Sequence, residues 1–329
     1  MKKYLFFASV LLFLGAGCAP SEKNTVPLSL EIQPEKIVYC SPDGTLIDHQ
    51  IKQEFKSYCL IPKSSTSFTP GIASTFSFTI LDNLGQTVKK FVVAHEQLMH
   101  VILVRKDFNE FQHIHPTFDA QTGLFTLSNV VFPTDGEYLL YADFVTELGG
   151  ESQGTTGAFS VSKTLSVGDA TKFSQPNLTV NTFNTLWSTK ATEELHTVTL
   201  QAFSSTRSVP FERGEQTNLF FLVEKNNKRP GDSKLDAIDP LEPYLGAMGH
   251  LVILQEGTNN YIHAHPTDEA STNGVGFSTY FASEGKYKLF FEFKNGGKVR
   301  RVEYVVEVKA GAETQVSQDM MMDHSSMGH

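Results

Sequence analysis

Short runs of alternating apolar and polar residues recur between about residue 65 and residue 309. Glycine, asparagine, aspartate or proline follows each run, as in STFSFTILDNLGQTV (74–88) and LFTLSNVVFPTDG (124–136). Alternation with period two places the apolar side chains on one face of a strand, and turns at this spacing are typical of antiparallel β-sandwiches. The pattern predicts an all-β protein.

Two segments indicate that this β-rich region is duplicated. HVILVRKDFNEFQHIHP (100–116) and HLVILQEGTNNYIHAHP (250–266) have the same spacing of three histidines, and GEYLLYADF matches GKYKLFFEF further along each half. Self-similarity at a fixed offset is the signature of repeated structural units. We therefore predict two tandem, related antiparallel β-sandwich domains, at 65–164 and 165–310.

The composition supports folded β domains. Hydrophobic residues make up 40% of the chain and charged residues 19%, with 26 phenylalanines and a single tryptophan. The formal net charge of −9 argues against binding nucleic acid or an anionic membrane surface by charge, because both need a basic face. The motifs HExxH, CxxC and the P-loop are absent, so the sequence gives no support to those enzyme classes.

The first twenty residues, MKKYLFFASVLLFLGAGCAP, have the features of an export signal: two lysines, a short apolar run and then small residues. Residues 14–18 resemble the lipobox of bacterial lipoproteins, although Gly15 departs from that motif. The resemblance implies removal of 1–17, a lipid on Cys18, a tether at 18–34 and a periplasmic or outer-membrane location. An ordinary signal peptide with a chance cysteine is the alternative.

Residues 35–64 hold a cysteine pair in a small appendage. In an oxidising compartment Cys40 and Cys59 are expected to form a disulfide, worth about 3 kcal/mol in the chain-entropy model. A thiolate metal site is the competing interpretation, although the histidine segments lie far away in sequence.

The second histidine segment fits a β-hairpin. If its turn is centred on Gly257 and Thr258, His250 lies opposite His265, and His263 lies on the same face along the diagonal. Three imidazoles would then converge, whereas a register error of one residue would move one strand's histidines to the other face.

The first segment gives the same arrangement, with His100 opposite His115 and His113 on the diagonal. Neutral imidazole is the commonest metal ligand, and three on adjacent strands form an open site for zinc or copper. We therefore predict one three-histidine site in each repeat, with binding that weakens below about pH 6.5, the ordinary histidine pKa. A lone strand histidine is more often only a hydrogen-bonded polar residue, but two equal sets favour ligation.

The methionines favour copper. Apart from the initiator, every methionine lies within four residues of a histidine, and thioether is a soft ligand that selects copper, particularly Cu(I). Met99 and Met248 lie beside the two histidine segments, where filling of the core is the alternative role.

The C-terminal residues 311–329 lack apolar periodicity and predict a disordered tail. The segment MMMDHSSMGH resembles the Met/His-rich segments of bacterial periplasmic copper-resistance proteins, which implies binding of Cu(I) by methionine and of Cu(II) by histidine; silver would also suit it. The candidate ligands are Met320, Met321, Met322, His324, Met327 and His329.

The repeats themselves resemble exported bacterial proteins with a GHLV…YxHxHP motif, which are similar to cupredoxin-like or immunoglobulin-like copper proteins. That resemblance implies a cupredoxin-like or immunoglobulin-like sandwich and names no activity. A blue-copper centre is not expected, because neither repeat contains the cysteine ligand that such a centre needs.

A metalloenzyme is the main rival. Gly257, His263, His265, Glu269 and Gly276 have the spacing of the first cupin motif, and that resemblance implies a barrel that binds iron, manganese or zinc. The first repeat departs from the motif, and residues 266–309 contain no later histidine for the partner motif. A surface lipoprotein with purely structural histidines is a third possibility.

The sequence therefore predicts an exported lipoprotein that binds copper, or zinc as the alternative, and is not an enzyme. Sequestration, resistance or delivery of the metal is the expected role, with a copper exporter or metallochaperone as partner and membrane contact through the lipid alone. The body ligands would be His100, His113, His115, His250, His263 and His265.

Overall fold

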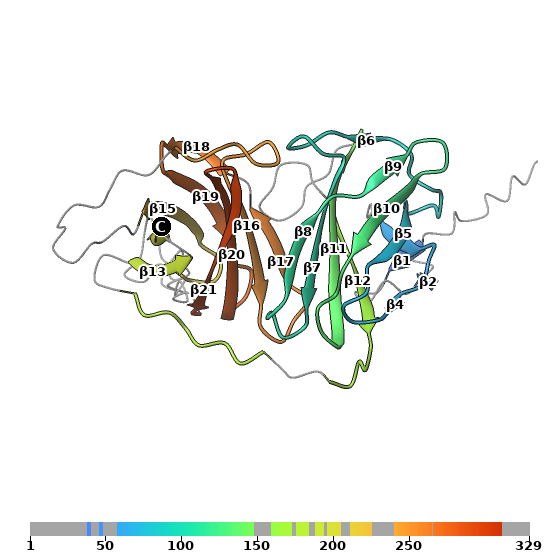
Figure 1. Ribbon diagram of the computed structural model, residues 1–329, viewed down its shortest axis with the longest axis horizontal. Coiled ribbons are helices and arrows are strands. Elements are labelled where there is room, and N and C mark those ends of the chain that lie inside the picture. The colour runs from blue at the N-terminus through green and yellow to red at the C-terminus, as the bar shows by residue number, and fades with distance from the viewer. Residues whose placement is uncertain are drawn as a thin grey trace, which may run out of the picture. The chain divides into compact units, whose positions relative to one another are not determined.

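The computed structural model describes residues 38–40, 46–48, 58–147, 159–172, 176–183, 188–193, 196–204, 211–225, 240–264 and 266–310. All of them lie in the compact unit Lys36–His329. Every regular element in these ranges is a β-strand (Figure 1), so none of them contains a helix that could cross a bilayer. The predicted signal, Cys18, the tether and the tail lie outside the described residues.

The first repeat is a β-sandwich. Its strands are β3 (Cys59–Pro62), β4 (Ser67–Phe68), β5 (Ser74–Leu81), β6 (Phe91–Val92), β7 (Met99–Arg105), β8 (Phe111–Ile114), β9 (Thr117–Asp119), β10 (Leu124–Val130), β11 (Gly136–Thr146) and β12 (Phe159–Val167). One sheet has the order β3-β5-β10-β9, and the other has the order β4-β12-β11-β7-β8 with β6 paired to β11. Only β4 and β12 pair in parallel among these strands.

The second repeat has the same plan. Its strands are β13 (Ser188–Glu193), β14 (His196–Ser204), β15 (Gln216–Lys225), β16 (His250–Gln255), β17 (Tyr261–Ala264), β18 (Pro266–Ser271), β19 (Gly274–Tyr280), β20 (Gly285–Asn295) and β21 (Lys298–Val308). The sheets have the orders β13-β14-β15-β19-β18 and β17-β16-β20-β21. Because β8-β7-β11-β12 and β17-β16-β20-β21 have the same order, the chain is an internal repeat of two antiparallel sandwiches, as predicted.

Alternation of side chains builds each core. Phe76, Phe78 and Ile80 of β5 point to the same side and pack against Val101 and Leu103 of β7, all of them buried. A separate cluster fills the second sandwich in the same way. Period-two alternation therefore accounts for the two cores.

The cysteine-pair region 35–64 is described in part. Val38–Cys40 (β1) and Leu46–Asp48 (β2) form a two-stranded sheet, whereas Cys59 begins β3 and pairs with Leu81 inside the first sandwich. Cys59 is buried and disulfide-bonded. The side chain of its predicted partner, Cys40, lies outside the described residues.

The two repeats meet through the sheets that carry the histidine segments. In Figure 1, β16, β17 and β20 lie beside β7, β8 and β11. A third buried cluster joins them, and its members include Ile102, Val104, Leu139, Tyr141, Val252, Leu254 and Phe290. Both faces of β7 and β16 are therefore covered, which explains why HVILV and HLVIL are continuous apolar runs without alternation.

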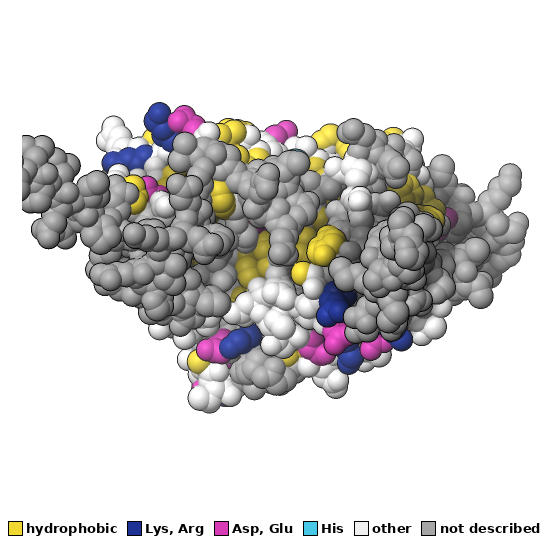
Figure 2. Space-filling view, turned by 180° about the vertical axis from the view of Figure 1, so that it is seen from behind, with side chains coloured by type: hydrophobic (Ala, Val, Ile, Leu, Met, Phe, Trp, Pro, Cys, Tyr) yellow, Lys and Arg dark blue, Asp and Glu magenta, His cyan; other side chains and the backbone are white. Residues whose placement is uncertain are grey.

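The described surface mixes charges of both signs. On the face shown in Figure 2, Lys and Arg side chains lie next to Asp and Glu side chains. Exposed hydrophobic side chains also lie on this face, near its centre.

Candidate metal centre

The first hairpin has the predicted register. Ile102 of β7 pairs with His113 of β8, and the same register opposes His100 to His115. The turn contains Phe108 at a φ of 62°, and the amide of Phe108 donates to the Arg105 carbonyl. The sequence-based register is confirmed, and it places the three histidines on one face of the sheet.

The second hairpin is also confirmed. Val252 of β16 pairs with His263 of β17, and Gly257 in the turn has a φ of 72°, which favours glycine. His250 and His263 consequently share a face. His265 lies outside the described residues.

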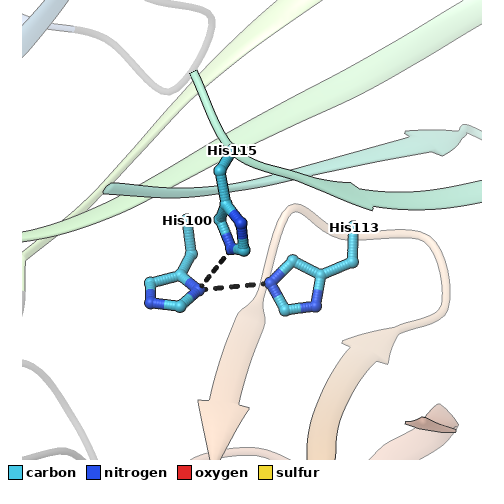
Figure 3. Close-up of side chains that lie close together, drawn as sticks. All are labelled: His100, His113 and His115. Carbon is cyan, nitrogen blue, oxygen red and sulfur yellow. Dashed lines mark hydrogen bonds between the residues drawn. The ribbon is translucent and has the colours of Figure 1, made fainter. Parts of the chain in front are cut away.

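Three histidines of the first repeat converge, and we call them the outer triad. The Nδ1 atom of His100 lies 3.3 Å from Nε2 of His113 and 3.0 Å from Nε2 of His115 (Figure 3). One ring nitrogen from each residue lies within 4.8 Å of the other two.

A second set, the inner triad, combines both repeats. It consists of His113, His250 and His263, again with one ring nitrogen of each within 4.8 Å of the others. The ring centroid of His113 is 5.1 Å from that of His250 and 5.5 Å from that of His263. The residues predicted for the first site do lie together as the outer triad, and the inner triad adds a grouping across the repeats that the sequence did not predict. The second predicted set, His250, His263 and His265, stays a prediction, because His265 lies outside the described residues.

Backbone carbonyls fix the orientation of two rings. The Nε2 atom of His100 lies 3.1 Å from the Ala94 oxygen, and Nε2 of His250 lies 2.8 Å from the Tyr244 oxygen. A carbonyl only accepts, so Nε2 must donate and Nδ1 of the neutral ring carries the lone pair. The buried Nδ1 of His250 makes no hydrogen bond within the described part of the chain, as expected of an atom reserved for another ligand.

The two carbonyls belong to matching tight turns, Ala94–Gln97 and Tyr244–Ala247. These turns pack together. A Cβ atom on Gly246, whose φ is 77°, would lie 2.8 Å from the carbonyl carbon of His95. Only glycine allows this close approach, so Gly246 contributes to the position of both carbonyls.

Carboxylates orient the other two rings, each from the opposite repeat. Nδ1 of His113 lies 3.1 Å from Glu292, and Nδ1 of His263 lies 2.9 Å from Asp143. Asp143 also accepts a short hydrogen bond from the Tyr261 hydroxyl. A histidine that donates one N–H to a carboxylate and presents its other nitrogen is the usual arrangement in metal sites.

Burial keeps these imidazoles neutral. Desolvation, reinforced by the neighbouring histidines, lowers the pKa of His100 and of His115 to about 4. The same causes lower the pKa of His250 and hold the pKa of His263 well below its ordinary value. Near pH 7 these four rings therefore carry lone pairs, as metal ligation requires.

The nitrogen separations fit an ion. With metal–nitrogen bonds of about 2.0–2.1 Å, two ligands of a tetrahedral centre are about 3.3 Å apart. The separations of 3.0 and 3.3 Å around His100 Nδ1 are close to that value. The donor set is all nitrogen and neutral, which suits copper or zinc.

The two described methionines, Met99 and Met248, pack in or against the hydrophobic cores. Met99 is buried in the first core, on the face of β7 opposite His100, and Met248 packs against the second core. Alternation along the strand directs Met99 away from the cluster and into the core, whereas ligation by Met248 stays a prediction. Met320, Met321, Met322, His324, Met327 and His329 lie outside the described residues.

The third ligand distinguishes the hairpin site from the cupin alternative. His250 lies beside His263, with ring centroids 5.8 Å apart, as the hairpin interpretation requires. The side chain of Glu269, which the cupin interpretation needs, lies outside the described residues.

Three contributors escaped the sequence analysis. Asp143 and Glu292 are acidic residues in the middle of apolar strands, at matching positions of the two halves. Because buried acids are rare unless they are paired, this pattern could have indicated that both contact a partner. His95 is partly buried, with its ring centroid 6.3 Å from that of His100, and it has no counterpart in the second repeat, where Leu245 occupies the same place.

Comparison with known proteins gives one family. The family model described as "Domain of unknown function (DUF8832)" matches residues 61–162 and 196–310. Among curated proteins, none matches the chain.

Solved structures give only weak likenesses. Titin domains Z1Z2 in complex with telethonin have 10% identity over 79% of this chain and 98% of that chain, with a TM-score of 0.19. Salmonella alpha-2-macroglobulin reacted with methylamine has 11% identity over 80% of this chain and 16% of that chain, with a TM-score of 0.23. Surface layer protein SbsC, domains 4–9, has 13% identity over 82% of this chain and 33% of that chain, with a TM-score of 0.19.

Proposed function

This chain belongs to the DUF8832 family, and we propose that its two repeats together bind one copper ion outside the cytoplasm, for sequestration or delivery. The observation that carries the proposal is the histidine cluster between the repeats. Carbonyls or carboxylates orient His100, His113, His250 and His263, and in each neutral ring they leave the second nitrogen with a lone pair. Because neighbouring lone pairs repel, a cation among them would be stabilising. The proposed role is binding, with no catalytic step.

Copper is preferred over zinc for two reasons. A set of imidazole ligands binds Cu²⁺ more tightly than Zn²⁺, in line with the general order of divalent metals. The predicted Met/His tail adds thioether ligands suited to Cu(I). The export signal and lipobox-like segment support an envelope location, where a copper exporter or metallochaperone is the proposed partner.

A structural role without metal is the second candidate. The pairs His113–Glu292 and His263–Asp143 each connect the two repeats, and hydrogen bonds of this kind would hold the sandwiches together by themselves. Metal content separates the two candidates.

Copper content after purification and dialysis tests the proposal. We would compare the full chain with a His250→Ala variant, both with serine in place of the tail ligands Met320, Met321, Met322, His324, Met327 and His329. The parent should retain about one ion per chain, and His250→Ala should retain markedly less, since two ligands remain in the inner triad. His196→Gln is the matched control, because this buried histidine binds Asn295 away from the cluster. A parent protein without bound copper would leave the structural role, whereas equal copper in parent and His250→Ala would remove His250 and the inner triad from the proposed site.

Acid should release the ion only well below pH 6.5. A proton competes with the metal for the ligand nitrogen, and competition begins as the pH approaches the pKa of the ring. Because burial lowers the pKa of His100 and His115 to about 4, the folded protein should keep its copper at pH 5.5 and lose it towards pH 4, which revises the sequence-based value. Dialysis across this range with metal analysis, and circular dichroism to monitor folding, would measure it. A release midpoint at 6.5 in folded protein would contradict this expectation.

A further inference from the structure

The two triads share a single histidine. Nδ1–H of His113 donates a hydrogen bond to the Glu292 carboxylate, so only Nε2 of this ring has a lone pair for a metal. One lone pair binds one ion. The outer and inner triads are therefore alternative positions for the same ion rather than two independent sites.

The triads differ in their access to solvent. In the outer triad, His115 is partly exposed. His95, which is also partly exposed, lies near His100 of the same triad. The inner triad is closed: His250 is 1% exposed, His263 is 5% exposed, and the side chain of His113 is fully buried. An ion arriving from solvent reaches the outer triad first.

We propose that one ion occupies the two positions in turn, with His113 as the ligand that holds it throughout. This inference rests on the proposed function. The ion first binds to His100, His113 and His115; the bonds to His100 and His115 then break as bonds to His250 and His263 form. The exchange needs no change in oxidation state and no additional reactant, and delivery to a partner follows the same route in reverse.

The outer triad is suited to capture of the ion and the inner triad to its retention. The outer nitrogens are already 3.0 and 3.3 Å apart, close to the separation in a complex, so capture needs little movement. The inner ligands come from both repeats and are held by Glu292, Asp143 and the Tyr244 carbonyl, so an ion there is shielded from water. His115 is therefore assigned to transfer, and His250 to retention.

Stopped-flow absorption with Cu(II), on the full chain with the tail ligands replaced by serine, tests this assignment. In His115→Ala, binding and chelator-driven release should both slow by on the order of tenfold. The stoichiometry and the equilibrium affinity should remain near those of the parent. His250→Ala should show the opposite pattern, with fast binding, fast release and weaker affinity.

Two outcomes would overturn the relay. Parent-like rates in His115→Ala would remove this residue from the route, and loss of the ion at equilibrium in His115→Ala would make it a permanent ligand. His196→Gln controls for general effects of removing a buried histidine. A parent protein that binds no copper would instead contradict the proposed function, so the two failures are distinguishable.

Discussion

Replacing His113 with alanine is expected to remove copper from the body of the protein more completely than any other single substitution. His113 belongs to both triads, so its loss leaves two ligands at each position. The affinity should fall by more than the roughly 10–100-fold typical of residues that only orient a ligand. Competition with a chromophoric Cu(II) chelator, on chain with the tail ligands replaced, would measure the change.

Glu292 provides the control for this experiment. His113→Ala also leaves the Glu292 carboxylate without this hydrogen bond, so some loss of stability is expected. Glu292→Gln retains His113 as a ligand and should weaken binding only within the roughly 10–100-fold range. Affinity of His113→Ala equal to that of Glu292→Gln would show that His113 acts through the interface and not as a shared ligand.

Replacing Asp143 with alanine is expected to have the largest effect on stability. Asp143, which is buried, accepts hydrogen bonds from the buried ring of His263 and from the hydroxyl of Tyr261, which is partly exposed. A buried donor deprived of its acceptor costs about 1–3 kcal/mol and the partly exposed Tyr261 hydroxyl costs about 1 kcal/mol, so the free energy of unfolding should fall by about 2–4 kcal/mol. Urea denaturation of the metal-free protein would measure this loss.

Tyr261→Phe is the matched control for Asp143→Ala. It removes one of the two donors, and it reproduces Phe111, the residue at the same place in the first repeat. Tyr261 stacks on Tyr141 with ring centroids 4.3 Å apart, and Phe111 stacks on Phe290 at 4.4 Å, so phenylalanine fits this geometry. We expect a loss of about 1 kcal/mol. Equal losses in the two variants would contradict the role given to the His263–Asp143 hydrogen bond.

Local features were predictable from the sequence because they depend on neighbouring residues. Alternation predicted strands, and the turn around Gly257 determined the register that opposes Val252 to His263. In a strand the side-chain period is two, so correct placement of the turn was sufficient to place His250 and His263 on a common face.

The joining of the histidine segments was not predictable in the same way. The continuous apolar runs in β7 and β16 indicate that both sheet faces are buried, but they do not say what covers the second face. Contacts such as His113 to Glu292 join residues 179 positions apart and depend on how complete sandwiches pack. Met99 is adjacent to His100 in sequence, but adjacent residues of a strand point to opposite faces, so Met99 lies in the core and not in the histidine cluster.

The reciprocal carboxylates have an evolutionary consequence. Each half of the chain supplies the acid that the other half's imidazole needs, so an ancestor with one copy would have completed this centre only by pairing with an identical molecule. Such a homodimer is constrained to place the same residue at both related positions. Once fused, the halves became free to diverge, and aspartate faces His263 while glutamate faces His113.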